Sequence, residues 1–217
     1  MPNFLVNHLT PPSYGEGSAQ SARLNRRGEQ IVMPWMTQLA LEGRMFSANA
    51  GTITTPVTGN LIVVDARPDV AIRVPSGTLI IPCYIGITLE ATGAVNPHEL
   101  LVRATTNDVG IGTSTAITAG PLNMHTTSGR ASNCVGRITY TADMTAATGS
   151  RELFRKQVNQ DLDATSIEPL FEISALTHPM PVLNGPASLL LYVSAPTTGA
   201  TFFAYVMWAE FTSSEMA

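Results

Sequence analysis

ASLLLYVS (residues 187–194) and TFFAYVMWAEF (residues 201–211) are two apolar runs, joined by six residues that include Pro196 and Gly199. Proline and glycine favour turns, so the pair predicts a β-hairpin. In the second run, residues at both parities are apolar. A strand with one face in water alternates between apolar and polar residues, whereas a strand covered on both faces does not. We therefore expect the core against one face of the second strand and another surface, such as a second subunit, against the other.

Strand patterns recur along the rest of the chain. In residues 78–90 every odd position from Leu79 to Leu89 is apolar. Pro82 cannot donate to a ladder and so marks an edge or a bulge there. Residues 151–162 are the one plausible helix, and they could equally be an irregular segment. About eight strands, frequent turn signals and little helix predict an all-β protein, a single jelly-roll-type β-sandwich. The shorter strand-like runs are residues 52–57, 61–64, 70–74, 99–105, 133–141 and 167–175.

The N-terminal part of the sequence differs from the β-rich remainder. We expect residues 1–50 to form an extended arm and a docking segment, and residues 51–217 to form the sandwich. Residues 1–27 are punctuated by proline and glycine and cannot bury enough apolar area to fold alone. Residues 29–46 are apolar without a clean period. Because Pro34 interrupts a helix there, we expect a strand-like segment that lies along the body.

Composition restricts the classes of function. The chain has 217 residues, enough for one large domain with or without an arm. Only 13% of residues are charged, which fits a surface packed against neighbours or a compact β protein with uncharged loops. The net charge of −4 argues against a nucleic-acid partner. No stretch approaches the roughly 18 apolar residues of a membrane span, so no membrane partner is expected.

Targeting and cysteine patterns indicate a reducing compartment. The N-terminal residues lack a basic region followed by an apolar block, so no signal peptide is expected and we predict synthesis in a cytoplasm. Cys83 lies in a strand-like run, and Cys83 and Cys134 form no C-x-x-C pattern. We expect Cys83 to be a buried free thiol rather than half of a disulfide.

Motifs that carry chemistry are absent or incomplete. The histidines form no ligand-spaced pair. Asp161 and Asp163 form a D-x-D pair without the glycine and glutamate of an EF-hand, which leaves a surface calcium open. A glycosidase with two carboxylates from distant strands also stays open, although nothing singles out such a pair. We therefore expect no enzyme, no metal site and no cofactor.

Several residues are candidates for contacts between subunits. The arginines at positions 23, 26 and 27 fit either a solvated, locally paired cluster or an anchor onto an acidic patch of a neighbour. Trp208 is most simply a core residue, whereas Trp35 lies outside the β-rich body in sequence and is the better interface candidate. The full set of candidate interface residues is Phe4, Leu5, Arg23, Arg26, Arg27, Trp35, Met36, Phe46, Phe203, Tyr205 and Met207.

Segments between residues 28 and 210 resemble recurring segments of bacteriophage virion proteins. They are GEQIV (28–32), PW (34–35), LALEGR (39–44), Phe46, VPSGT (74–78), IIP (80–82), GPASL (185–189) and WAE (208–210). The resemblance implies a jelly-roll structural subunit of a phage particle, such as a capsid, decoration, spike or tail component. The resemblance transfers no active-site residues. The low charge, the apolar arm that cannot fold alone and the strand apolar on both faces predict self-association, with the arm reaching onto a neighbour. We expect a homo-oligomer, trimer or higher, that contacts other virion proteins and assembles in the host cytoplasm.

Two other classes of function remain open. A carbohydrate-binding or host-attachment jelly roll would carry an exposed aromatic side chain beside Asp or Asn. An enzyme on a β-sandwich scaffold would need carboxylates or histidines that converge in a pocket. A glycan ligand has no support from the sequence itself.

Overall fold

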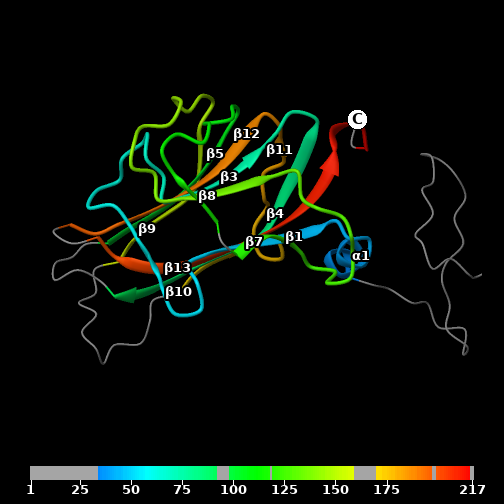
Figure 1. Ribbon diagram of the computed structural model, residues 1–217, viewed down its shortest axis with the longest axis horizontal. Helices are drawn as coiled ribbons and strands as arrows, with labels where there is room; N and C mark the ends of the chain where they lie inside the picture. The colour runs from blue at the N-terminus through cyan, green and yellow to red at the C-terminus, as the bar shows by residue number, and fades with distance from the viewer. Residues whose placement is uncertain (1–33, 92–97, 118, 159–169, 197–198, 216–217) are drawn as a thin grey trace, which may run out of the picture.

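The computed structural model describes residues 34–91, 98–117, 119–158, 170–196 and 199–215, which form a sandwich of two antiparallel sheets (Figure 1). The expected all-β class with little helix is confirmed. The described elements are α1 (Trp35–Leu41), β1 (Met45–Ala50), β2 (Val57–Thr58), β3 (Val70–Val74), β4 (Thr78–Ala91), β5 (His98–Thr105), β6 (Thr115–Ala116), β7 (Ala119–Asn123), β8 (Val135–Ile138), β9 (Arg151–Val158), β10 (Leu170–Ser174), β11 (Leu183–Asn184), β12 (Ala187–Ser194), β13 (Thr201–Thr212) and the 3-10 turn η1 (Ser213–Glu215).

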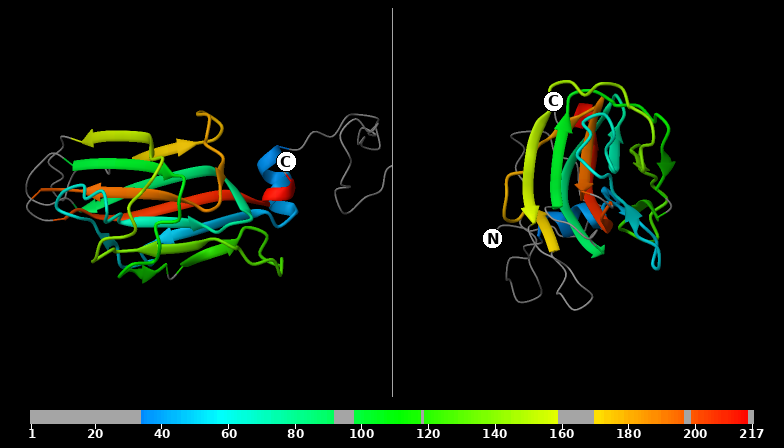
Figure 2. Two further views of the ribbon diagram at one scale, coloured as in Figure 1. Left: turned by 90° about the horizontal axis from the view of Figure 1, so that it is seen from above. Right: turned by 90° about the vertical axis from the view of Figure 1, so that its left-hand side faces the viewer.

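The two sheets lie face to face, with the main core between them (Figure 2). The larger sheet has the order β10-β4-β13-β1-β7, with β11 also paired to β4 and β2 to β13. The smaller sheet has the order β6-β8-β3-β12-β5-β9. Phe46 of β1 and Trp208 of β13 stack in the core with ring centroids 6.4 Å apart, and both are 0% exposed. Trp208 is therefore a core residue, the simpler of its two interpretations.

The two runs that predict a hairpin are strands of different sheets. Their bounds are close to the prediction, since β12 is Ala187–Ser194 and β13 is Thr201–Thr212. However, β12 pairs with β3 and β5, whereas β13 pairs with β1 and β4. The hairpin prediction is wrong because the connection crosses between the layers.

The outer face of the smaller sheet is covered by the chain's own loops. Leu190 and Tyr192 of β12 point away from the main core and belong to a second buried cluster. The hydroxyl of Tyr192 donates a hydrogen bond to the carbonyl oxygen of Asp65 at 2.8 Å, which holds one of these loops in place. The other buried members of the cluster are Ala71, Leu101, Val109, Tyr140 and Met144. Both faces of β12 are thus covered within one chain.

A β-bulge divides the long strand β4. Tyr84 and Pro82 pair with consecutive residues of β13, which leaves Cys83 as the extra residue. Of the two features expected at Pro82, an edge or a bulge, the structure has the bulge, since β4 lies between β10 and β13. Its consequence is that the odd positions of β4 do not share one face. Ile85 lies in the main core, whereas Cys83 packs in a separate cluster on the outer face of the larger sheet.

Residues 35–50 contain a helix and a strand instead of the expected extended docking segment. Pro34 precedes the first residue of α1, and its carbonyl accepts a hydrogen bond from the N–H of Gln38 at 3.1 Å. A proline in this place breaks no helical bond, so the strand-like expectation is wrong there. Strand β1 pairs with β13 and β7 inside the larger sheet. The sandwich therefore includes residues 45–50, which are expected from the sequence to belong to the arm and docking segment (residues 1–50).

Residues 151–162 are expected from the sequence to be a helix or an irregular segment, and both expectations are wrong for residues 151–158, which form strand β9 at the edge of the smaller sheet. Phe154 pairs with Val102 and Glu152 with Arg103, which leaves Leu153 as an extra residue in a bulge. Leu153 and Phe154 are both half-buried and both pack against the main core. Two adjacent apolar residues on one side imitate helical spacing, although a bulged strand produces the same pattern.

Candidate interaction surface

The second face of β13 is covered by the chain's own helix at one end. Residues 202, 206 and 208 face the core and are at most 1% exposed, whereas residues 203, 205 and 207 between them are half-buried. At the C-terminal end of β13, side chains of α1 pack on the outer face. We call this group the outer cluster: Met45, Cys83 and Ala209, with Met36, Leu39, Ala40, Ile81, Met207 and Phe211 around them. At this end of β13, the apolar residues of the second face are therefore covered by the same chain and need no second subunit.

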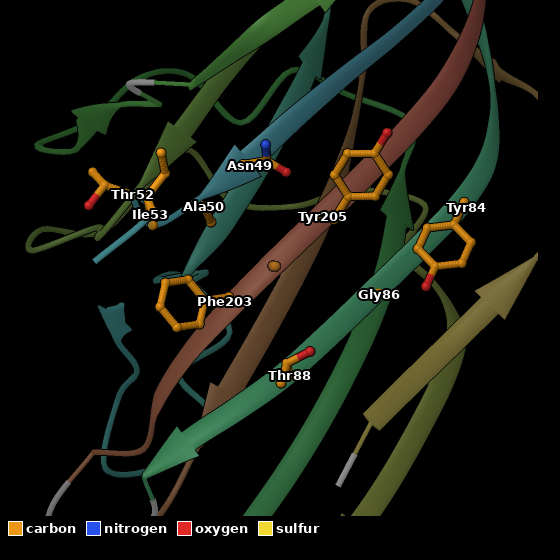
Figure 3. A pocket seen from close by; sticks show the side chains of 11 residues that line it. Asn49, Ala50, Thr52, Ile53, Tyr84, Gly86, Thr88, Phe203 and Tyr205 are labelled. Atoms are coloured by element: carbon orange, nitrogen blue, oxygen red, sulfur yellow. The ribbon is translucent and has the colours of Figure 1, made fainter. Parts of the chain in front are cut away.

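At the N-terminal end of β13 the outer face forms a shallow groove of about 330 Å³, which we call the sheet groove. Phe203 and Tyr205 project into it from β13, beside Tyr84 and Thr88 from β4 and Asn49 from β1 (Figure 3). The remaining lining residues are Ala50, Gly51, Thr52, Ile53, Gly86 and Ala204. The groove and the outer cluster occupy the two ends of the same sheet face.

The aromatic rings of the groove lie against glycines. A Cβ atom at Gly86 would lie 2.9 Å from Cε1 of Tyr84, so this ring rests on the bare backbone. Tyr205, in register with Gly86, has its ring centroid 5.8 Å from that of Tyr84 with a tilt of 56°. In the same way, a Cβ at Gly51 would lie 2.7 Å from Cδ1 of Phe203. Glycine at both positions permits this close approach of the rings to the backbone. We call the three rings of Tyr84, Phe203 and Tyr205 the aromatic floor of the groove.

Polar groups beside the rings are neutral or acidic. Asn49 is exposed and in register with Tyr205, and Thr88 is in register with Phe203. Glu172 of β10 is exposed and in register with Gly86. Burial and, after it, the charge of Glu172 raise the pKa of Tyr84. The lining contains no lysine or arginine. This surface can pack against apolar or planar groups, exchange hydrogen bonds and attract a cation.

Exposed apolar side chains lie both in the groove and beyond it. Ile53, in the loop after β1, is fully exposed, and Leu122 of β7 is 60% exposed. Leu122 is in register with Ser47 of β1. The hydroxyl of Tyr205 lies 3.7 Å from the sulfur of Met124, which is 41% exposed. Grouped exposed apolar residues are typical of interaction surfaces, whereas single ones need no explanation.

The fold disperses the interface residues expected from the sequence. Phe203 and Tyr205 lie in the sheet groove, and Trp35, the first residue of α1, is 43% exposed. Met36 and Met207 pack in the outer cluster of their own chain. Phe46 corrects the prediction, since it is fully buried beside Trp208 and reaches no surface. The N-terminal candidates Phe4, Leu5, Arg23, Arg26 and Arg27 lie outside the described residues.

Three important groove residues escape the sequence analysis: Asn49, Tyr84 and Gly86. The even positions of residues 78–90 are visibly a mixed face, and this mixture is the signal that could have placed Tyr84 and Gly86 on an outer surface. Nothing in the sequence places Asn49 beside Tyr205, because that contact depends on the pairing of β1 with β13. Register between distant strands is a property of the fold.

Buried carboxylates in this protein hold loops. Glu210, fully buried, accepts hydrogen bonds from Oγ of Ser132 at 2.6 Å and from the N–H of Asn133 at 2.9 Å. These contacts fix the segment before β8 against β13. Across the described part of the chain, no group of three or more His, Cys, Asp or Glu side chains is placed to hold a metal ion. Asp161 and Asp163, the pair considered for calcium, lie outside that part.

Both cysteines are buried free thiols, which confirms the expectation for Cys83. Burial raises the pKa of Cys83 to about 11. Burial and the charge of Glu210 raise the pKa of Cys134. Neither thiol has the exposure or the lowered pKa of a reactive cysteine.

Comparisons with protein-family models, with curated proteins and with solved structures find no match for this chain. Within the described ranges, no helix is long and apolar enough to span a bilayer. The function is therefore inferred from the fold and from the sheet groove.

Proposed function

We propose that this chain is a structural subunit of a bacteriophage particle that self-assembles through its N-terminal arm and its sandwich faces, as a capsid or capsid-decorating protein. It acts in the virion as a homo-oligomer of three or more copies, in contact with other virion proteins, after assembly in the host cytoplasm. The resemblance of segments between residues 28 and 210 to phage virion proteins supports the viral context. The role is that of a building block and not of an enzyme.

The strand order supports a jelly-roll topology. Eight strands form the centre of the sandwich, in the orders β10-β4-β13-β1 and β3-β12-β5-β9. The successive strands β3, β4 and β5 alternate between the two sheets, and so do β9, β10, β12 and β13. Two four-stranded antiparallel sheets connected in this manner are typical of jelly rolls, a fold used by viral capsid and lectin domains.

The observation that carries the proposal is the difference between the two outer faces. Loops of the chain cover the outer apolar side chains of the smaller sheet, as the second buried cluster shows. On the larger sheet, Phe203, Tyr205 and Tyr84 remain half-exposed in an open groove. Contact with a neighbour would bury this area at roughly 25 cal/mol per Å², less the cost of ordering the partners. A surface poor in charge supports the same conclusion.

Light scattering on the purified full chain tests the proposal. We expect the mass of a trimer or a larger assembly. Tyr205→Asp introduces a charge into the sheet groove and should lower this mass. Ile111→Asp makes a comparable change at a side chain that is 51% exposed in the loop between β5 and β6, and should leave the mass unchanged. A wild-type chain that stays monomeric at micromolar concentration contradicts the proposal.

Carbohydrate binding is the second candidate, and the geometry of Tyr84 favours it. The far end of this ring lies over Gly86, with the polar side chains of Asn49 and Thr88 in the same groove. Aromatic faces beside amide and hydroxyl groups suit a sugar ring. Binding on a glycan array that Tyr84→Ala abolishes, by a chain that remains monomeric, would favour this role over assembly.

A further inference from the structure

The sheet groove is uncovered in a specific place. At one end of β13, α1 covers the outer face through Met36 and Leu39, whereas at the other end Phe203 and Tyr205 line the open groove. The segment before Pro34 thus joins the described part of the chain on the covered half of the same face. An occupant of the open half has to be apolar enough to match three aromatic rings.

Residues 1–33 have the composition for this role. Their first nine residues include Phe4, Leu5, Val6 and Leu9, and proline and glycine follow, so these side chains are not matched to a helix or a core of their own. Residues 1–27 carry three arginines against Glu16 as the one acidic residue. The chain as a whole has a formal charge of −4, so the remaining residues are net acidic. Glu172, exposed beside Gly86 and Tyr84, puts one of those negative charges at the groove.

The length of this segment favours a neighbouring copy as the acceptor. About 25 residues separate Leu9 from Pro34, and they span roughly 80 Å when extended. Strand β13, with 12 residues, is only about 40 Å long. The groove of the same chain lies within that 40 Å, so the segment is far longer than a docking onto its own face requires. The extra length is enough to cross to another copy.

We propose that the apolar residues near Phe4 and Leu5 of one copy occupy the sheet groove of a second copy, with the following arginines directed toward the acidic side of the face at Glu172. This inference rests on the proposed self-association and names the surface that receives the arm. It also accounts for the aromatic floor, because Tyr84, Tyr205 and Phe203 offer apolar contact without requiring a fixed pattern of hydrogen bonds.

Cross-linking between two differently tagged full-length chains tests the proposal. One chain carries Leu5→Cys and the other Thr88→Cys, at a half-buried position in the groove. The native thiols of Cys83 and Cys134 are buried and do not interfere. After mixing and treatment with a short bis-maleimide, we expect a cross-linked heterodimer. Ser150→Cys, an exposed position before β9, replaces Thr88→Cys as the matched control and should give at least tenfold less product.

Each other outcome has a definite meaning. Cross-linked dimers of the Thr88→Cys chain alone would show that two faces pack together, which overturns the proposal. A chain with both substitutions that cross-links only within itself would show docking in cis and overturn it as well. Assembly by light scattering without cross-links to Thr88→Cys overturns the groove assignment but leaves self-association intact. A monomer by light scattering, with no cross-links, overturns both.

Discussion

Oδ2 of Asp69 accepts a hydrogen bond from the backbone N–H of Val193 at 2.7 Å. Asp69 directly precedes β3, and Val193 belongs to β12 of the same sheet. Oδ1 of the same carboxylate accepts two more from Asn60, from its N–H at 3.1 Å and from Nδ2 at 2.9 Å. Asp69 thereby ties the loop before β3 to β12. Its side chain is almost fully buried, and burial raises its pKa to about 7 although the backbone hydrogen bonds lower it.

The stability of the protein should therefore fall between pH 4 and pH 7 through Asp69. In the unfolded chain this carboxyl loses its proton near pH 4, whereas in the folded chain it does so near pH 7. The folded state holds more protons in between, so the free energy of unfolding decreases as the pH rises through this window. The change is at most about 4 kcal/mol. Urea unfolding at pH 5 and pH 8 measures it.

Two variants isolate the contribution of Asp69. Asp69→Asn cannot ionise, so the difference between pH 5 and pH 8 should shrink relative to the wild type. Asp143→Asn is the matched control, because this side chain is 65% exposed and paired with Arg67 at the surface. It should keep the wild-type dependence. Equal pH profiles for wild type and Asp69→Asn would mean that Asp69 does not titrate in this range.

Phenylalanines on the two faces of the larger sheet should differ in their effect on stability. Phe46→Ala opens a cavity beside Trp208 in a fully buried position and should cost about 3–5 kcal/mol. Phe203→Ala removes a half-buried ring from the sheet groove and should cost no more than about 1 kcal/mol in a monomer. Chemical denaturation of both variants gives the comparison. Similar losses of unfolding free energy in the two variants would mean that Phe203 is packed as tightly as a core residue, which contradicts its position in an open groove.

Periodicity identifies most of the strands of this protein, because alternation depends only on near neighbours in the chain. It gives β12 at its observed bounds and β13 with an error of one residue. It misses the crossing between them, since the loop with Pro196 and Gly199 carries turn residues whether the next strand lies in the same sheet or the opposite one. The runs expected as strands at residues 52–57 and 61–64 are also wrong, since they lie outside strands except for Val57 of β2. Bulges cause two further errors. The extra residue at Leu153 gives β9 a helical spacing, and the one at Cys83 exchanges the faces of β4.

The candidate site is only partly accessible to such reasoning. The apolar second face of β13 indicates that Phe203, Tyr205 and Met207 need a cover. Which cover each one has depends on tertiary contacts, since α1 covers Met207 and leaves Phe203 open. The helix itself is missed because Pro34, taken as an interruption, stands before its first residue. Tyr84 is found only through its register with β13.

Both thiols should be inert in the folded protein. With a pKa of about 11, Cys83 holds well under 1% of thiolate at pH 8, and its side chain is 0% exposed. Cys134 is 4% exposed and its pKa is raised further by the charge of Glu210. A disulfide reagent such as Ellman's should therefore react only at the rate of unfolding, and reach two thiols per chain in urea. Rapid labelling of one thiol in native buffer would contradict the burial of that residue.

Gly86→Ala should disturb the sheet groove and leave the fold intact. The new Cβ would lie 2.9 Å from Cε1 and 3.0 Å from the hydroxyl of Tyr84, both at the far end of a side chain that can rotate outward. We expect Tyr84 to leave the backbone, a change in unfolding free energy within about 1 kcal/mol, and weaker self-association because the aromatic floor is broken. Gly129→Ala is the control, since a Cβ there meets nothing within 4 Å. Urea unfolding and light scattering of both variants separate the two effects. Full assembly by Gly86→Ala would show that the contact of Tyr84 with Gly86 has no part in association. A loss of several kcal/mol would show that the ring has no freedom to move.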